Sequence, residues 1–261
     1  MSAAVEARPT IDRRWLERVA ALDPLTHAYA LWDLDRTPQA VRFVSALLGE
    51  ETVGYLLVWL GRRDRPVVHW FGEPGLADVL VPGFPAPPFV AVVPPEVAPV
   101  VLAAFSGGRS SPLKLMLREP GELGPPATPV RRLRREDRAE VTALVRGHPE
   151  PELAAYLGLD PEGEPAWGAF DGRRLVGVAR AAVRLPRLWV IGGVFVVPEH
   201  RGQGLGAALV SAVVASAEAH GARVGLYVRD DPDGAFRLYE RLGFREVGRR
   251  AWLDVSPPPK R

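Results

Sequence analysis

Three glycines alternate with other residues in Arg201–Ala207, directly before a long apolar segment with helical periodicity. The first N–H groups of a helix lack intrahelical acceptors, and the helix dipole makes that end positive. Glycine has no Cβ atom and adopts positive φ, so Gly202, Gly204 and Gly206 would let a ligand come close to these N–H groups. The pattern therefore predicts a binding site for a phosphate-bearing ligand.

The same residues can also be aligned with the dinucleotide pattern G-x-G-x-x-G/A, with Gly202, Gly204 and Ala207 in its three places. In that fold the first glycine ends the first strand of a parallel unit, whereas residues 198–201 intervene here after a predicted meander. Asp230 and Asp231 follow the next strand, farther on than the usual distance of about 20 residues. A dinucleotide-dependent oxidoreductase remains an alternative that a nucleotide-binding measurement can test.

The elements that must position these glycines follow the order βααβββαβαβ from residue 130 onward. Apolar periodicity and turn residues, including the hairpin signal Asp171-Gly172, define them. We expect strands at 128–133, 165–170, 174–183, 188–197, 222–228 and 246–255, and helices at 135–147, 151–159, 204–220 and 233–242.

With this order and these glycines, the residues from 130 onward resemble the GNAT superfamily of acyl-CoA-dependent N-acyltransferases. The pyrophosphate loop of that family reads Q/R-x-x-G-x-G/A, and Arg201, Gly204 and Gly206 occupy its specified positions. A second block, residues 233–244, is similar to the family pattern N-x-x-A-x-x-L-Y-E-x-x-G-F. Its matching residues are Ala235, Leu238, Tyr239, Glu240, Gly243 and Phe244. Pro232 replaces the family's asparagine, which removes any hydrogen bond that this asparagine would give the cofactor.

The resemblance implies that acetyl-CoA binds as cosubstrate, without a metal ion. The residues that would bind it are Val194, Phe195, Val196, Arg201, Gly202, Gln203, Gly204, Leu205, Gly206 and Ala207. By position, the Val194 N–H would face the thioester oxygen, where a donor stabilises the developing oxyanion by a few kcal/mol, and Val196 would pair with the pantetheine. Tyr239 would be the general acid that protonates the leaving thiolate, because a phenol stays protonated at neutral pH. Core packing is the alternative role for this tyrosine.

The general base and the acceptor pocket are less sharply defined. Many relatives carry a glutamate on the central strand, but the corresponding position, near Val190, is apolar. Other candidate bases are Glu150, Glu152, Glu162, Glu164, His148 and His200. Surface exposure is the alternative for each, and the amine could also arrive deprotonated.

Candidates to line the acceptor pocket are Trp167, Trp189, Arg180 and Arg184. Arginines there would suit an acceptor with a carboxylate, with a surface position as the alternative.

The first half of the chain predicts a second domain. Residues 119–130 are rich in proline and glycine, so we place a boundary there and expect domains at 1–126 and 127–261. In the first half we expect a helix from Ile11 with Thr10 as its N-cap, a helix at 94–105, and strands at 41–48, 52–60, 66–71, 89–93 and 113–117. This is roughly the GNAT order without the glycine pattern. The expected fold is a mixed, mostly antiparallel α/β GNAT domain preceded by a degenerate GNAT-like domain.

Composition limits the class of protein. The 261 residues are 47% hydrophobic and 25% charged, and they carry a formal net charge of +2. The absence of cysteine excludes disulfides, thiolate metal sites and a cysteine nucleophile. Scattered basic residues argue against a nucleic-acid partner, and no apolar run reaches the roughly 18 residues of a membrane span.

These limits, together with the resemblance, lead to one expected function. We expect a cytoplasmic N-acetyltransferase, a monomer or homodimer, which acts on a small-molecule amine or an amino terminus. A non-catalytic acyl-CoA-binding regulatory module is the principal alternative, and an interaction protein would leave the glycines unexplained.

Overall fold

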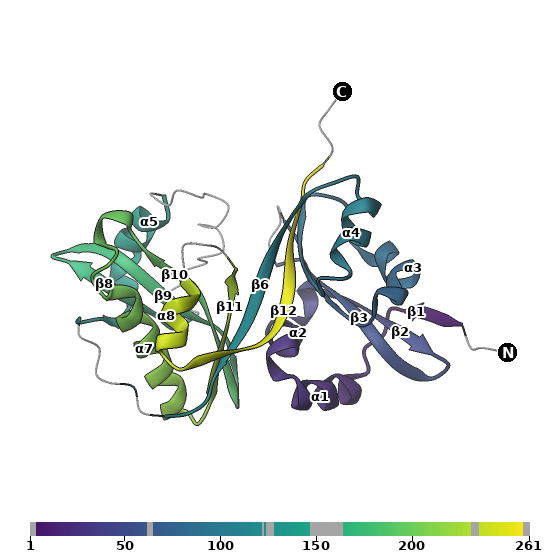
Figure 1. The fold of residues 1–261 in the computed structure, drawn as a ribbon, viewed down its shortest axis with the longest axis horizontal. Coiled ribbons are helices and arrows are strands. Elements are labelled where there is room, and N and C mark those ends of the chain that lie inside the picture. Colours follow the sequence, from purple (N-terminus) through teal and green to yellow (C-terminus); the bar gives the residue numbers. More distant parts are fainter. Residues whose placement is uncertain are drawn as a thin grey trace. The chain divides into compact units, whose positions relative to one another are not determined.

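Two compact units make up the chain in the computed structural model (Figure 1). The described residues are 4–61, 65–121, 123, 128–146, 164–230 and 235–257. The first unit combines Met1–Leu115 with Gly248–Arg261, and the second is Met116–Val247. Two strands are divided between the units: β6 (Arg109–Arg118) begins in the first and ends in the second, and β12 (Phe244–Val255) begins in the second and ends in the first.

The second unit contains the predicted site residues. Its strands are β7 (Arg131–Arg132), β8 (Ala166–Asp171), β9 (Arg174–Leu185), β10 (Leu188–Val196) and β11 (Arg223–Arg229). Its helices are α5 (Arg138–Arg146), α7 (Leu205–Ala219) and α8 (Ala235–Arg241). Neighbouring strands from β7 to β10 pair antiparallel, and β10 pairs in parallel with β11. The turn between β8 and β9 contains Gly172 at φ +57°, as the Asp-Gly hairpin signal predicts.

The helices of this unit hold the loop after β10 against the sheet. Helix α7 packs on strands β8 to β11, and α8 packs on α7 and β11 (Figure 1). Alanine and branched aliphatic residues fill α7, and Leu209, Val210, Val213 and Val214 are completely buried. Gly177 in β9 permits close packing, because a Cβ atom there would lie 3.0 Å from Leu209 Cδ1. The beginning of α7 is therefore fixed by a packed helix.

The first unit has a similar order of elements, compared over the described residues. Its strands are β1 (Val5–Arg8), β2 (Val41–Leu48), β3 (Glu51–Trp59), β4 (Val67–Phe71) and β5 (Phe89–Val93). Its helices are α1 (Arg13–Leu22), α2 (Pro24–Arg36), α3 (Ala77–Leu80) and α4 (Ala98–Ala104). Strands β1 to β4 pair antiparallel in turn, β4 pairs in parallel with β5, and the end of β12 pairs antiparallel with β5.

Alternation along β3 builds a core on each face of the first unit's sheet. Tyr55 and Leu57 belong to one apolar cluster with Trp15 of α1 and Ala30 of α2. Leu56 and Val58 belong to another, which contains residues of α3, α4 and β12. Side chains at successive strand positions point to opposite faces, so this strand serves both cores.

Some expectations for the first half differ from the structure. The N-cap of α1 is Asp12, whose carboxylate accepts from the Trp15 N–H at 2.8 Å, and not Thr10. Asp23-Pro24 does end α1, but it also begins α2, because Asp23 caps the new helix and proline fits its first turn. This second helix was not expected.

The expected division into 1–126 and 127–261 also differs from the two compact units. The C-terminal half of β12 pairs with β5, and Ala251, Leu253 and Val255 belong to the first unit's core. The predicted second helix at 151–159 lies outside the described residues. Among the described helices, none is both long and apolar enough to cross a membrane.

Candidate functional site

A β-bulge interrupts β10 at the predicted thioester position. Gly192 pairs with Arg180 of β9, and the next paired residue is Phe195, which faces Val178. One extra residue of β10 is accommodated there, and Gly193 takes φ +60°. The Gly-Gly pair in the sequence could have predicted this bulge, because glycine inside a strand often marks one.

Strands β10 and β11 separate where the bulge begins. Their parallel pairing ends at Ile191 and Leu226, although β10 continues to Val196 and β11 to Arg229. The Val197 N–H donates to Val176 O of β9 at 2.9 Å. Because successive N–H groups of a strand alternate in direction, the Val196 N–H faces the edge where β11 has separated. This edge can pair with an extended ligand in place of a strand.

The loop that follows, residues 201–207, is called here the glycine loop. Gly202 has φ +75°, and Gly204 has φ +78° and is the N-cap of α7. Neither glycine is required by crowding, since a Cβ atom at either would meet nothing within 4 Å. Positive φ is therefore the structural reason for glycine at these two positions.

Most backbone N–H groups of the glycine loop lack a backbone acceptor among the described residues; the exception is the Arg201 N–H, which donates to Pro198 O at 3.2 Å. Within the described ranges, no carbonyl accepts a hydrogen bond from the N–H groups of residues 202 to 207, and the first bond of α7 joins Ala208 N to Gly204 O at 3.0 Å. The first turn of α7 carries no acidic side chain. A row of free donors at the positive end of a helix is suited to a pyrophosphate.

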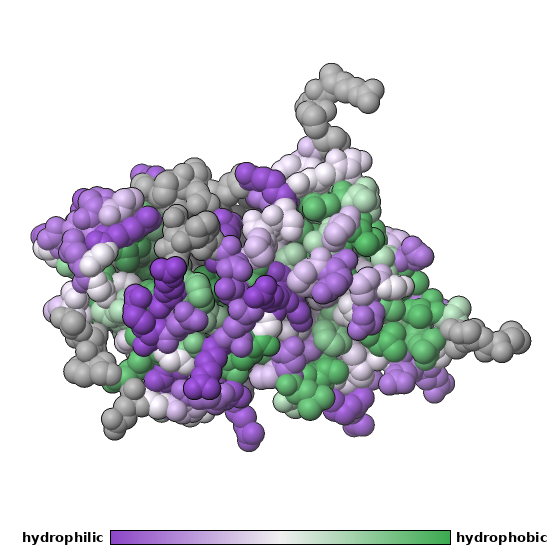
Figure 2. All heavy atoms as spheres, viewed as in Figure 1, coloured by the Kyte–Doolittle hydropathy of each residue, from purple (hydrophilic) through white to green (hydrophobic). Residues whose placement is uncertain are grey.

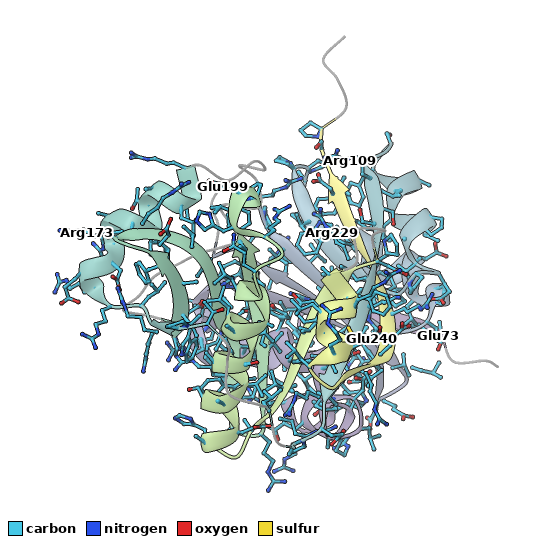
Figure 3. All side chains as sticks on the ribbon, turned by 60° about the vertical axis from the view of Figure 1, so that its left-hand side comes forward. Glu73, Arg109, Arg173, Glu199, Arg229 and Glu240 are labelled. Atoms are coloured by element: carbon cyan, nitrogen blue, oxygen red, sulfur yellow. The ribbon has the colours of Figure 1, made fainter. Side chains whose placement is uncertain are left out.

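Arg201 has a structural role in this arrangement. Its Nε donates to the Val196 carbonyl at 3.0 Å, which ties the glycine loop to the end of β10. Glu199, labelled in Figure 3 near the beginning of α7, forms an ion pair with Arg174 at 2.8 Å. A backbone N–H and Arg174 both donate to this carboxylate and lower the pKa of Glu199. The acid two residues before the glycine loop is therefore matched by a cation.

Tyr239 lies on α8 in a nearly closed environment. Its side chain is 7% exposed and contacts Phe244 edge to face, with 6.0 Å between the ring centroids. Burial raises the pKa of Tyr239 to about 12. Within the part of the chain that the structure describes, its hydroxyl has no hydrogen-bond partner. A protonated phenol in this position can donate a proton to a ligand.

The candidate bases do not converge on Tyr239 in the described residues. His148, Glu150, Glu152 and Glu162 lie outside those residues. Glu164 forms an ion pair with Arg180. His200 Nε2 lies 3.2 Å from Asp171 Oδ2. Val190 is completely buried and apolar, as expected.

The proposed acceptor residues have mixed positions. Trp167 and Trp189 are 8% and 6% exposed and belong to the core, and Trp189 packs against His220. Arg180 pairs through its backbone with Gly192 beside the bulge. A cavity of about 490 Å³ opens elsewhere in the unit, beside β7 and the β8–β9 hairpin. Its lining includes Arg131, Asp137 and Phe170 and none of the predicted cofactor-binding residues.

The first unit has no comparable anion site after its corresponding strand. The segment after β4 contains Glu73, labelled in Figure 3, and leads into a helix of only four residues. A Cβ atom at Gly72 would lie 2.5 Å from Leu76 Cδ1, so the protein's own side chain fills the space above this glycine. The short helix and the acid explain why this unit lacks the phosphate-binding pattern.

One family model matches part of the chain. Residues 130–244 match the family model described as the acetyltransferase (GNAT) family. No curated protein matches the chain.

Solved structures resemble nearly the whole chain in fold. A Drosophila protein is 15% identical with a TM-score of 0.71, covering 97% of this chain and 99% of that one. A GCN5-related N-acetyltransferase from Sphaerobacter thermophilus is 19% identical with a TM-score of 0.62, covering 98% of each chain. A tandem GNAT protein from the clavulanic acid biosynthesis pathway is 16% identical with a TM-score of 0.54, covering 98% of this chain and 100% of that one. Residues 130–244 are therefore identified as a domain of the acetyltransferase (GNAT) family.

Proposed function

We propose that this protein is an N-acyltransferase that uses acetyl-CoA, or another short acyl-CoA, to acylate the amine of a small molecule or an amino terminus. The observation that carries the proposal is the row of free N–H groups in residues 202–207, at the beginning of α7 and directly after the strand separation. The match of residues 130–244 to the acetyltransferase (GNAT) family supports the class of reaction, acyl transfer from acyl-CoA.

The glycine loop would hold the pyrophosphate of the cosubstrate. Among the described residues, the N–H groups of Gln203, Gly204, Leu205, Gly206 and Ala207 have no backbone acceptor, and they would donate to phosphate oxygens. Arg201 would keep the loop in place through its bond to Val196 O, and the open edge at Val194–Val196 would pair with the pantetheine amides. Side-chain identity at these valines should matter little, because the backbone makes the contacts.

The bulge and Tyr239 would perform the two chemical tasks. When bound, acetyl-CoA supplies an activated thioester. The Val194 N–H would donate to the thioester oxygen as negative charge develops there, which is the role of an oxyanion hole. Tyr239, protonated because burial raises its pKa to about 12, would donate its phenolic proton to the departing sulfur. The amine nitrogen would form the new bond to the acyl carbon, and the carbon–sulfur bond would break. The nitrogen would lose one proton to water, and the Tyr239 phenolate would take one proton back from water, which restores the phenol.

A calorimetric titration of the purified chain with acetyl-CoA, coenzyme A and NAD tests the proposal. We expect acetyl-CoA and coenzyme A to bind and NAD not to bind. Binding of NAD alone would replace the proposal with a dinucleotide-dependent activity.

Catalysis is then tested by release of coenzyme A with glycine, lysine, spermidine and an alanine-initiated peptide as acceptors. The chain has no cysteine, so a thiol reagent reports coenzyme A without interference from the protein. Tight binding without release in any of these reactions would favour a non-catalytic acyl-CoA-binding module, for which the apolar Val190 is the supporting feature.

A further inference from the structure

Arg118 is a buried cation at the end of β6, outside the residues that match the family model. It is 4% exposed. A buried guanidinium destabilises a fold unless its N–H groups find acceptors, so the partners of such a residue show what it holds together.

Three separate segments of the second unit provide those partners. The Nε of Arg118 donates to the Leu242 carbonyl at 2.9 Å, directly after α8. One terminal nitrogen donates to the Gly121 carbonyl at 2.6 Å, and the other pairs with the Glu218 carboxylate near the end of α7. Arg118 therefore connects the ends of α7 and α8 with the segment that enters the unit.

The contact with Leu242 leads to Tyr239 through one hydrogen bond. The Leu242 N–H donates to the Tyr239 carbonyl at 3.0 Å, so Leu242 is held by Tyr239 on one side and by Arg118 on the other. Gly243, at φ +82°, then turns the chain toward Phe244, whose ring contacts Tyr239. A Cβ atom at Gly243 would lie 3.6 Å from Arg118 Nε, which shows how closely the arginine approaches this turn.

Helix α8 depends on such support because it has only seven described residues. Isolated helices shorter than about 12 residues are marginal in water, so tertiary contacts must fix α8. The contacts of α8 include Leu238 against Gly206 of α7 and the hydrogen bond from Arg118 at its C-terminal end.

We infer that Arg118 is a positioning residue for Tyr239, which fixes the C-terminal end of α8 so that the phenol points at the reacting thioester. The inference rests on the proposed role of Tyr239 as general acid. Arg118 would act on the proton transfer and not on cosubstrate binding, because its hydrogen bonds within the described residues go to Leu242, Gly121 and Glu218 and not to the glycine loop. The catalytic unit would then be incomplete without residues that precede the family match.

The test is a double-mutant cycle in the full chain, with Arg118→Met and Tyr239→Phe separately and together. Turnover is measured as coenzyme A release from acetyl-CoA with the fastest amine of the four named above, and affinity is measured by titration with acetyl-CoA. We expect Arg118→Met to lower kcat by about tenfold to a hundredfold, as a small misplacement of a catalytic group can, and to change the acetyl-CoA Kd by less than about twofold. When Tyr239→Phe is already present, adding Arg118→Met should have little further effect on kcat. Equal fold losses in both backgrounds would overturn the inference.

Glu218→Gln is the matched control. It removes the charge partner of Arg118 on α7 but leaves the bond to the Leu242 carbonyl, so it should lower thermal stability and largely preserve kcat. If Glu218→Gln lowers kcat as much as Arg118→Met does, the loss of turnover comes from the contact with the end of α7, and the inference fails.

Hydrogen–deuterium exchange provides a readout that does not require turnover. Arg118→Met should speed exchange in 235–243 and leave 205–210 unchanged, and Arg118→Lys serves as a second variant if the methionine variant does not fold. Unchanged exchange in 235–243 would overturn the inference even if wild-type protein binds acetyl-CoA and acylates an amine. If wild-type protein neither binds nor turns over acetyl-CoA, the proposed function itself has failed, and exchange still reports whether Arg118 fixes α8.

Discussion

Leu238 lies so close to Gly206 that a Cβ atom on Gly206 would stand 3.2 Å from Leu238 Cδ2. Unlike Gly202 and Gly204, Gly206 is helical, so its small size and not its φ is what the fold uses. This contact joins the beginning of α7, where the cosubstrate would bind, to the helix that carries Tyr239.

Substitutions at Gly206 should therefore depend on size. Gly206→Ala should change the free energy of unfolding by less than about 1 kcal/mol, because the end of the Leu238 side chain can move and alanine favours the helix. Gly206→Val should cost about 1–3 kcal/mol through overpacking. Urea unfolding of both variants measures this, and an equal effect of alanine and valine would contradict the packing role.

Tyr239→Phe should reduce kcat by about a hundredfold or more and leave the acetyl-CoA Kd nearly unchanged, because only the proton donor is lost. The wild-type kcat should not fall through ionisation of Tyr239 below about pH 11, since burial raises its pKa to about 12. Tyr55→Phe, which removes a buried hydroxyl from the first unit, is the control. An unaltered rate for Tyr239→Phe would remove the tyrosine from the mechanism.

Two buried histidines should make folding sensitive to acid. Burial lowers the pKa of His27 and of His69 from 6.5 to about 4. Between these pH values the unfolded chain binds protons that the folded chain does not, so the free energy of unfolding rises with pH from about 4 to 6.5 and is constant above. Each histidine contributes a slope of about 1.4 kcal/mol per pH unit.

Urea titrations from pH 4.5 to 7 measure this slope. His69→Gln should remove about half of the histidine contribution. If the free energy of unfolding depends on pH equally in the variant and in wild-type protein, the pKa of His69 is not lowered in the folded state.

The end of β12 should stabilise the first unit. Leu253 is completely buried in that unit's core, whereas Val247 of the same strand is 54% exposed. Leu253→Ala should lower the free energy of unfolding by about 2–5 kcal/mol, and Val247→Ala should change it by less than about 0.5 kcal/mol. Similar effects of the two substitutions would contradict the assignment of the C-terminal residues to the first unit.

Much of the second unit was predictable because its signals are local. The Asp171-Gly172 hairpin, the strand at 188–197 and the helix after Gly204 each follow from turn residues and periodicity, and the structure confirms them. The order of the described elements of this unit also follows the prediction, and the predicted helix at 151–159 lies outside the described residues. What could not be predicted depends on contacts between distant residues. Arg118 shows no pattern of its own, and its partners Glu218 and Leu242 are about a hundred residues away.

The first half was less predictable for the same physical reason. Asp23-Pro24 is a pair that can end one helix and begin the next, and the burial of residues such as Leu25, Ala28 and Ala30 favours the second helix in the folded chain. The place of the C-terminal residues is also set by pairing, since Ala251–Val255 could only be assigned to the first unit through β5.

The central claim is that the glycine loop binds the pyrophosphate of acyl-CoA, and one paired comparison of affinities tests it most directly. Gly204 and Gly221 lie just beyond opposite ends of α7, have φ of +78° and +72°, and would each accept a Cβ atom without contact. Asp at either position therefore meets the same backbone strain, but only Gly204→Asp places a negative charge beside the proposed phosphate site. Titration with acetyl-CoA should show at least about a tenfold loss of affinity, or about 1.4 kcal/mol, for Gly204→Asp and an unchanged Kd for Gly221→Asp. Equal affinities of the two variants for acetyl-CoA would contradict the account.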